Sequence, residues 1–362
     1  MPLLQEDERY MRRSLRLARR GMGKVSPNPM VGAIIVRSGE VIAEGYHHRF
    51  GSDHAEIKAI KKAWGGIEGA TLYVNLEPCC HWGKTPPCVD AVIREGIKRV
   101  VIGTLDPNPL VNGKGVEILE RHGITVEIGV LEEAARRLNE VYFKYIVTGL
   151  PFTTLKYAQS LDGRIATAKG DSHWISSERS RRFAHRLRSQ HDAIMVGIGT
   201  VLIDNPLLTV RWVKGKNPLR IVLDSQLRIL PSAHVLSAEE DTVIATTDLC
   251  DRRKIEEIKK RGKEVLVTQR SKDGRVELRP LMKSLAERGI SSILVEGGRE
   301  VITSLLKERL VDRMVIITAP LITGKGVEGI GDLGIDELKK AIKPSSVHVR
   351  RIGEDIIFDL RL

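Results

Sequence analysis

The chain has 362 residues, 42 % of them hydrophobic and 29 % charged, a size that predicts two domains at roughly 100–200 residues per domain. The net charge of +12 is compatible with a protein that binds nucleic acid, with one that binds phosphorylated small molecules, or with a basic surface that has no partner. Because aromatic residues are only 4 % and no basic run is interleaved with them, we expect phosphorylated small-molecule substrates and no nucleic acid.

The first half of the chain alternates helical and strand patterns. Met11, Leu15, Ala18 and Met22 recur at helical spacing and predict an opening helix that ends before Pro27. Strands are then expected at Met30–Arg37, Val41–Tyr46, Thr71–Asn75, Arg99–Thr104 and Ile124–Val130. Helices are expected at His54–Trp64, Val89–Arg94 and Gly115–Arg121. This alternation predicts a layered α/β domain.

The segment Leu138–Pro151 has mixed character and ends in Gly149-Leu150-Pro151, where we place the boundary between domains 1–148 and 149–362. Beyond it, strands are expected at Phe152–Ala158, Ala193–Gly197, Leu219–Asp224, Thr242–Thr246, Glu264–Thr268, Ser292–Glu296 and Arg313–Thr318, with a terminal hairpin at Ser346–Arg351 and Asp355–Leu360. Helices are expected at Ser177–His191, Asp251–Arg261, Pro280–Arg288 and Arg299–Arg309. The second half therefore also predicts an α/β domain.

No run of about 18 apolar residues exists, so we expect no membrane-spanning helix. The first residues mix both signs of charge on an apolar stripe, unlike a signal peptide. Three of the four cysteines stand at 79, 80 and 88, which indicates a metal or thiol site in a reducing compartment and not a disulfide framework. The cytoplasm is therefore the expected location.

The strongest chemical signal is His54-Ala55-Glu56 followed by Glu77-Pro78-Cys79 and then Cys88. A catalytic zinc needs three protein ligands and an open position, which His54, Cys79 and Cys88 would provide for Zn²⁺. Glu56 is only two residues from His54, too close in one helical turn for both side chains to coordinate the same ion. We expect it to take a proton from the attacking water and return it to the leaving ammonia. Pro78 further predicts that Cys79 opens a helix, whose dipole favours the thiolate.

Two alternatives stay open for these residues. The ligands could form a closed zinc site of His54, Cys79, Cys80 and Cys88, or the thiols could be buried without a metal. Adjacent cysteines seldom both reach one ion, and a closed site would leave Glu56 without a role. The second cysteine of the known zinc deaminases follows the first by three positions. The longer interval from Cys79 to Cys88 disfavours a generic cytidine deaminase and indicates a specific branch.

Four segments resemble the deaminase domain of the bifunctional riboflavin-biosynthesis deaminase/reductase family: Pro27-Asn28-Pro29, His54-Ala55-Glu56, the run from Glu77 to Cys88, and Asp106-Pro107-Asn108-Pro109. The resemblance implies a cytidine-deaminase-like three-layer domain that deaminates 2,5-diamino-6-ribosylamino-4(3H)-pyrimidinone 5′-phosphate at its 2-amino group. It also implies substrate contacts at Asn28, His47, Lys84 and Asn108. From the residues alone, Asn28 and Asn108 could instead be turn residues beside prolines, which is the less favoured interpretation. Most family members have Ser at the position of Cys80.

In the second half, no Gly-x-Gly-x-x-Gly follows a strand, which disfavours a Rossmann domain. Ser291–Glu296, then Gly297-Gly298, then a helical run would form a phosphate cradle, because bare amides and the helix dipole face the anion. A plain strand-to-helix turn explains the same residues.

The segments around Lys156, Ser160–Arg164, Ser172–Ile175, Gly199–Pro206 and Val295–Gly298 resemble the reductase domain of the same family. The resemblance implies a dihydrofolate-reductase-like fold that uses NADPH to reduce the ribosylamino group of 5-amino-6-(5-phosphoribosylamino)uracil to ribitylamino. The implied cofactor positions are Ala158, Trp174, Thr200, Asp204, Ser225, Gly298, Arg299, Glu300, Val301, Ile302, Thr303 and Ser304. The implied substrate positions are Lys156, Ser172, Arg188, Leu208, Arg211 and Glu296.

Some of these residues suit such chemistry unaided. Arg188 and Arg211 could bind the substrate 5′-phosphate, bidentately if the geometry allows, and Asp204 and Glu296 could orient a ribose hydroxyl or relay a proton. A single Arg in Ser177–His191 could instead belong to a solvated helix face.

Two other functions remain as rivals. One is a nucleoside, dCMP or tRNA deaminase with an appended regulatory domain. The other is a zinc-stabilised nucleic-acid-binding protein, which gives Glu56 no role. For the leading interpretation we also expect a homo-oligomer.

Overall fold

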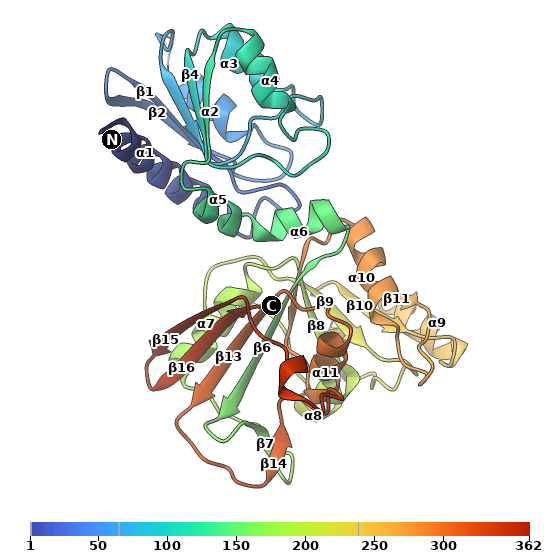
Figure 1. Ribbon diagram of the computed structural model, residues 1–362. Coiled ribbons are helices and arrows are strands. Elements are labelled where there is room, and N and C mark those ends of the chain that lie inside the picture. Colours follow the sequence, from blue (N-terminus) through green and yellow to red (C-terminus); the bar gives the residue numbers. More distant parts are fainter. Residues whose placement is uncertain (1, 64–65, 238) are drawn as a thin grey trace. The chain divides into compact units, whose positions relative to one another are not determined.

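The computed structural model describes residues 2–63, 66–237 and 239–362 (Figure 1). The chain divides into two compact units, one ending at Gly149 and the other beginning at Leu150. The boundary expected from the sequence falls one residue earlier. Within the described residues, no helix has both the length and the apolar character needed to cross a membrane.

The first unit is built on a five-stranded sheet in the order β2-β1-β3-β4-β5. β1 pairs antiparallel with β2 and β3, whereas β3, β4 and β5 are parallel. The strands are β1 (Gly32–Arg37), β2 (Glu40–Tyr46), β3 (Thr71–Val74), β4 (Arg99–Ile102) and β5 (Thr125–Ile128).

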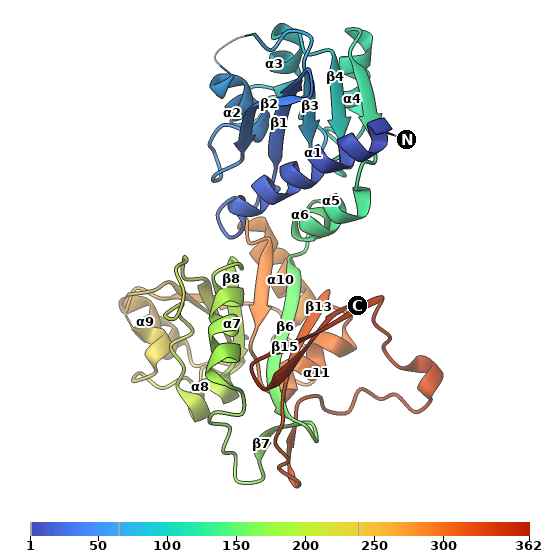
Figure 2. The same cartoon turned by 90° about the vertical axis from the view of Figure 1, so that its left-hand side faces the viewer.

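Helices cover both faces of this sheet. Successive strand residues point to opposite sides, and in β1 both sets are apolar, so each face needs a covering layer. Ala33 and Ile35 pack with the helices on one face, which are α2 (Ala55–Lys62), α3 (Cys88–Arg94) and α4 (Lys114–Arg121). Ile34 and Val36 pack with the helices on the other face, which are α1 (Pro2–Ala18) and α5 (Glu132–Leu138). The unit is therefore a three-layer α/β/α sandwich, as expected (Figure 2).

Close packing against β2 positions the start of α2. A Cβ atom added at Gly45 would lie 2.4 Å from the Ala55 carbonyl oxygen and 2.6 Å from the Ala59 nitrogen. Only glycine allows this approach, which holds the first turn of α2, including Glu56, against the sheet.

The expected strands and helices of this unit are confirmed, with ends shifted by a few residues. The helix expected to reach Trp64 ends at Lys62, and Trp64 lies outside the described residues. The prediction that Cys79 opens a helix is wrong. Cys79 lies in an irregular segment after β3, and the helix begins at Cys88, after a different proline, Pro87. Helices α5 and α6 (Glu140–Thr148) were not expected.

The second unit contains a nine-stranded sheet in the order β11-β10-β9-β8-β12-β6-β13-β16-β15. Strands from β11 to β13 in this order are parallel, and β16 and β15 continue antiparallel. The strands are β6 (Phe152–Ser160), β8 (Ala193–Gly197), β9 (Leu219–Leu223), β10 (Thr242–Thr246), β11 (Glu264–Val267), β12 (Ser292–Val295), β13 (Arg313–Ala319), β15 (Ser346–Ile352) and β16 (Asp355–Arg361).

Two hydrophobic clusters lie on opposite faces of the nine-stranded sheet. Ala193 and Met195 pack toward α10 (Leu278–Glu287) and α11 (Arg299–Lys307). Ile194 and Val196 pack toward α7 (Glu178–Arg188), α8 (Ile198–Asp204) and α9 (Arg252–Lys260). The expected strands and the four expected helices are confirmed. The short helix α8 and the two-stranded ribbon of β7 (Arg164–Thr167) and β14 (Gly326–Glu328) were not expected.

Candidate active sites

Three metal-binding side chains meet in the first unit. His54 directly precedes α2, Cys79 follows β3, and Cys88 is the first residue of α3. Their ligand atoms all lie within 4.8 Å of one another, with His54 Nδ1 3.5 Å from Cys79 Sγ and 3.3 Å from Cys88 Sγ. A tetrahedral zinc with ordinary bond lengths separates its nitrogen and sulfur ligands by about 3.6 Å. The donor set and its spacing fit this ion.

Neighbouring groups orient the three donors. Thr85 Oγ1 lies 3.3 Å from His54 Nε2, which leaves Nδ1 directed at the thiols. The Cys88 amide donates to Cys79 Sγ at 3.4 Å. Hydrogen bonding from the Cys88 thiol, and then from His54, lowers the pKa of Cys79. Cys80 Sγ instead faces the Leu110 carbonyl at 3.5 Å, so the closed four-ligand arrangement is not formed.

Glu56 lies in the first turn of α2 and is only 3 % exposed. Its Oε2 atom is buried and has no hydrogen-bond partner among the described residues. Burial raises the pKa of this carboxyl group. A buried carboxyl with one free oxygen beside a three-donor cluster can exchange a proton with a small molecule held there.

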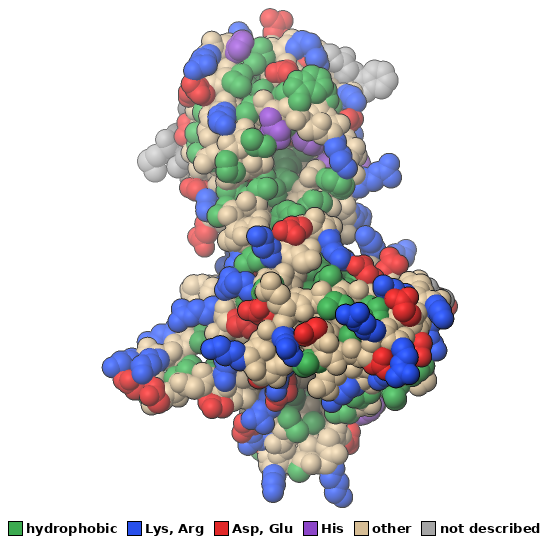
Figure 3. Space-filling view, turned by 90° about the vertical axis from the view of Figure 1, so that its right-hand side faces the viewer, with side chains coloured by type: hydrophobic (Ala, Val, Ile, Leu, Met, Phe, Trp, Pro, Cys, Tyr) green, Lys and Arg blue, Asp and Glu red, His purple; other side chains and the backbone are tan. Residues whose placement is uncertain are grey.

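A pocket of about 260 Å³ opens beside this cluster. Glu56, His54 and Cys79 line it, whereas Cys88 is fully buried and does not. On this unit, Figure 3 shows histidine side chains gathered beside a hollow in the surface. The pocket also contains the four residues expected to contact the substrate, which are Asn28, His47, Lys84 and Asn108.

Hydrogen bonds define what Asn28 can offer to a ligand. His47 is buried, and this burial lowers its pKa, so its ring is neutral. Its Nδ1 lies 3.2 Å from the Asp53 carbonyl and must donate there, which leaves Nε2 to accept from Asn28 Nδ2 at 3.2 Å. The Oδ1 atom of Asn28 then remains as an acceptor for a ligand amino group or ring N–H.

A cation stands at the same pocket. The Lys84 ammonium lies 3.9 Å from the centroid of the Phe50 ring, and both residues line the pocket. The aromatic face holds the ammonium by a cation–π contact and leaves its N–H donors available for an anion.

Sequence reasoning missed several residues of this site. The buried carboxylate of Glu77 accepts main-chain N–H bonds from four residues at 3.0–3.3 Å, which are Asp106, Gly113, Gly115 and Val116. It thereby fastens the loop that contains Asn108 to the segment that contains Cys79. Glu77 and Thr85 were visible within the quoted motif but had no assigned role. Tyr142 belongs to a helix that was not expected.

The second unit holds a larger cavity of about 1160 Å³. It opens where β8, β9 and β12 reach their carboxyl ends, the usual ligand position in a parallel sheet. After β12, Gly297 passes so close to α11 that an added Cβ would lie 2.9 Å from Val301 Cβ. Gly298 caps α11 without a side-chain hydrogen bond, so the first amides of the helix are available to a phosphate. These features fit a dinucleotide cofactor.

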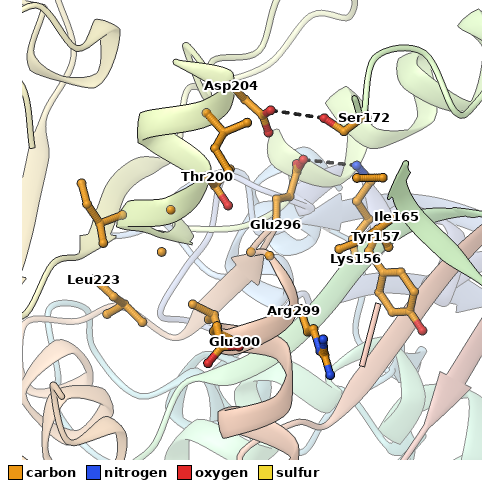
Figure 4. Close-up of a pocket in the computed structure, with 18 of the residues that line it drawn as sticks. Lys156, Tyr157, Ile165, Ser172, Thr200, Asp204, Leu223, Glu296, Arg299 and Glu300 are labelled. Carbon is orange, nitrogen blue, oxygen red and sulfur yellow. Dashed lines mark hydrogen bonds and ion pairs between the residues drawn. The ribbon is translucent and has the colours of Figure 1, made fainter. Parts of the chain in front are cut away.

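Most of the expected cofactor positions line this cavity (Figure 4). They are Ala158, Trp174, Thr200, Asp204, Ser225, Gly298, Arg299, Glu300, Val301 and Ser304. Ile302 and Thr303 do not line it. The Ile302 side chain is fully buried in the core, and Thr303 Oγ1 is bonded to the Arg299 carbonyl and the Gly331 amide. Cofactor contacts of these two residues stay predictions.

A buried ion cluster lines the cavity. Arg188 binds Glu296 bidentately, with Nε 2.7 Å from Oε1 and Nη2 3.0 Å from Oε2, and Lys156 Nζ lies 3.2 Å from Oε2 (Figure 4 shows the lysine contact). Burial alone would favour the neutral acid, but Arg188 and then Lys156 hold the pKa of Glu296 far below its ordinary value.

The phosphate contact expected for Arg188 stays a prediction. Its Nη1 also donates to the Thr209 carbonyl at 3.0 Å, so each of its three guanidinium nitrogens already donates one hydrogen bond within the protein. Arg211 is exposed and donates to Thr209 Oγ1 at 2.8 Å. It lines the cavity and is the better placed of the two for a phosphate.

The remaining expected substrate residues differ in their placement. Ser172 donates to Asp204 Oδ1 at 3.2 Å, which joins a substrate position to a cofactor position (Figure 4). Leu208 is 3 % exposed, packs in the core and is not among the residues that line the cavity.

An aromatic ladder at the cavity was also missed. The Arg181 guanidinium lies 3.9 Å from the Trp174 ring and 5.3 Å from the Trp212 ring, and Trp212 stacks on His185. Trp174 is 66 % exposed and has a positive φ of 66°, a conformation rare for a bulky residue. From the sequence, an Arg on α7 could not be distinguished from a residue on a solvated helix face.

Comparisons with known proteins agree with this division. A family model described as the RibD C-terminal domain matches residues 151–358, and one described as the cytidine and deoxycytidylate deaminase zinc-binding region matches residues 4–104.

Relatives match over nearly the full length. The chain is 47 % identical over 352 residues to the riboflavin biosynthesis protein RibD of Aquifex aeolicus, covering 97 % of each chain. It is 39 % identical to the Escherichia coli protein of the same name, covering 98 % of this chain and 99 % of the other. The crystal structure of a diaminohydroxyphosphoribosylaminopyrimidine deaminase/5-amino-6-(5-phosphoribosylamino)uracil reductase from Thermotoga maritima superposes with a TM-score of 0.88, at 38 % identity and 99 % coverage of both chains.

Proposed function

The chain belongs to the family of bifunctional riboflavin-biosynthesis deaminase/reductases, and from this we propose that it deaminates the diaminopyrimidine nucleotide 2,5-diamino-6-ribosylamino-4(3H)-pyrimidinone 5′-phosphate and then reduces the resulting 5-amino-6-(5-phosphoribosylamino)uracil. The enzyme has a zinc-binding deaminase domain and an NADPH-dependent reductase domain with a dihydrofolate-reductase-like fold.

In the deaminase site, His54, Cys79 and Cys88 would hold the zinc, which supplies the Lewis acidity that makes a water molecule nucleophilic at neutral pH. Glu56 takes the proton from the attacking water on its free Oε2 and delivers it to the departing 2-amino nitrogen. Asn28 and Asn108 orient the pyrimidine, and the Lys84 ammonium binds the phosphoribosyl part.

In the reductase site, the start of α11 and the positions that line the cavity from Ala158 to Ser304 would hold NADPH, which supplies the hydride. Arg211 binds the 5′-phosphate of the substrate. Glu296 fixes the ammonium of Lys156 so that its remaining N–H donors point at the ribose, and Asp204 with Ser172 orients the sugar hydroxyls.

The observation that carries this proposal is the unpartnered, buried Glu56 oxygen beside a three-donor zinc cluster and in one pocket with all four expected substrate residues. A zinc-stabilised nucleic-acid-binding protein gives Glu56 no role. A nucleoside, dCMP or tRNA deaminase with a regulatory domain does not account for the match of residues 151–358 to the RibD C-terminal domain.

Incubation of the protein with the diaminopyrimidine nucleotide, with and without NADPH, tests it. Ammonia should appear in both samples, and NADPH absorbance should fall only after ammonia has been released. NADPH oxidation without ammonia release, or no ammonia at all from zinc-loaded protein, would show that the proposed substrate is wrong.

We further propose that the enzyme works in the cytoplasm as a homo-oligomer and that its pocket cations bind phosphorylated small molecules and not nucleic acid. The four cysteines are free thiols, as a reducing compartment allows. Val347 and Val349 on the edge strand β15 are more than half exposed, which suits contact with a second copy. Light scattering of the purified protein measures the oligomeric state.

A further inference from the structure

We propose that helix α6 forms part of the deaminase substrate site. Tyr142 of this helix positions Asn108, and Asn139, the residue that directly precedes the helix, positions Asn28. This inference rests on the proposed function of that pocket and adds two residues to it. Tyr142, Tyr145 and Ile146 of α6 line the same pocket as Asn28 and Asn108.

Tyr142 acts on the loop that contains Asn108. Its buried hydroxyl lies 3.0 Å from Asp106 Oδ1 and 3.2 Å from Oδ2. The same Oδ1 accepts the main-chain N–H of Asn108 at 2.9 Å. Burial raises the pKa of Asp106 to about 6, and the hydrogen bonds from Asn108 and Tyr142 oppose this rise by stabilising the ionised carboxylate. The helix therefore fixes the carboxylate that in turn fixes Asn108.

Asn139 acts on the loop that contains Asn28. Its side-chain Oδ1 accepts the Met30 amide at 2.8 Å, and its Nδ2 donates to the Met30 carbonyl at 3.0 Å. Asn75, at the end of β3, donates to the same carbonyl at 3.0 Å. Both asparagines are buried, so these bonds are shielded from water. Met30, two residues after Asn28, is thus held from the α6 side and from the sheet side.

The spacing of the two residues explains why one short segment can serve both loops. Residues three apart near a helix share one face, so Asn139 reaches Met30 from behind the pocket while Tyr142, which lines it, reaches Asp106. The zinc-binding region shared with cytidine deaminases ends at residue 104, whereas α6 begins at residue 140. The wall is therefore supplied by the part of the chain that lies beyond the common zinc-binding region, where adaptation to a ribosylaminopyrimidine can reside.

The same unit contains a matched bond away from the pocket. Tyr73 Oη donates to Asp7 Oδ1 at 2.7 Å, and both residues are buried in the α1 layer. Neither lines the pocket. Replacing Tyr73 with Phe removes one buried tyrosine–aspartate hydrogen bond, as Tyr142→Phe does, and Asp7 keeps its pairing with Arg99.

The test compares Tyr142→Phe with Tyr73→Phe in the full-length, zinc-loaded enzyme. We expect Tyr142→Phe to keep its zinc and its kcat and to raise the KM for deamination about tenfold, the factor that one hydrogen bond to a charged group supports. The two variants should lower the melting temperature by similar amounts, because each loses one buried tyrosine–aspartate hydrogen bond. Tyr73→Phe should leave the KM for deamination within about twofold of the wild-type value.

Three outcomes would overturn the proposal: an unchanged KM in Tyr142→Phe, an equal KM increase in Tyr73→Phe, or an increase in Tyr142→Phe that adds fully to that of Asp106→Ala in the double variant. The last would show that Tyr142 does not act through Asp106. A wild-type enzyme that releases no ammonia contradicts the proposed substrate, which distinguishes that failure from this one. Zinc content and a cooperative thermal melt show that the deaminase unit of each variant is folded, and reduction of the already deaminated substrate shows that the second unit is intact.

Discussion

Glu56 in the deaminase pocket and Glu296 in the reductase cavity are both buried carboxyl groups, yet their surroundings are opposite. Glu56 has a free oxygen and a pKa raised by burial. Glu296 lies between Arg188 and Lys156, and its pKa is held far below the ordinary value. Burial alone therefore does not assign a role to a carboxyl group. The unpaired one is suited to carrying a proton, and the paired one to fixing cations.

The largest expected effect tests whether the deaminase half of this comparison depends on its metal. Cys88→Ser should lose most of the zinc and all ammonia release, because two ligands do not hold a catalytic zinc. Reduction of the deaminated substrate should continue. Metal analysis and both half-reactions are the measurements, and a variant with its full zinc content would contradict the ligand assignment.

The next prediction separates the carboxyl group from the metal. Glu56→Gln should keep the zinc and slow deamination by about 10²–10⁴-fold, the range for losing general acid–base catalysis. Glutamine has nearly the volume of glutamate, so the first unit should keep its fold. Reduction takes place in the second unit and should be unaffected. Ammonia release at a near wild-type rate would mean that another group moves the proton.

A smaller effect is expected for the paired carboxylate. Glu296→Gln leaves Arg188 and Lys156 without their counter-charge, and reduction should fall by about 10- to 100-fold, as for a lost contact of ~1.5–3 kcal/mol. Deamination should continue unchanged. Assays of both half-reactions in this variant measure the difference, and loss of both activities from folded protein would favour a composite site.

The depressed pKa of Glu296 also fixes the sign of a pH effect. Its contribution to folding stability is fully present above its ordinary pKa of 4.5 and is lost only as the pH falls toward the lower value in the folded protein. Thermal melts of wild-type enzyme and Glu296→Gln should therefore differ by a constant amount between pH 6 and 8, a window chosen to lie well above that value. The difference should shrink in stronger acid.

The deaminase site was more readable from the sequence than the reductase site, for a physical reason. Zinc accepts few kinds of donor, and His54, Cys79 and Cys88 lie in two short segments with an interpretable spacing. The cavity of the second unit is lined by residues from many strand ends. Nothing in the sequence indicated that Arg188 would form an ion pair with Glu296 or that Leu208 would face the core. Those facts depend on packing.

The helices α5 and α6 were missed because their apolar periodicity is weak. Among their residues only Ala135 and Tyr142 are buried, and Val147 is 65 % exposed. The helix expected at Cys79 failed for a related reason. A proline before a cysteine does mark a helix start in this chain, but at Pro87-Cys88 and not at Pro78-Cys79.

The short connection between α6 and β6 determines where the chain can be divided into two separate polypeptides. Helix α6 ends at Thr148, Gly149 stops it with a positive φ of 65°, and β6 begins at Phe152. A break in this three-residue stretch would give two polypeptides that each retain a complete set of pocket residues. A break placed soon after residue 104, where the recognisable zinc region ends, would discard Asn139 and Tyr142 and yield a fragment that still carries every zinc ligand but has lost one wall of its pocket. Stand-alone versions of either activity are therefore best made by cutting at Gly149.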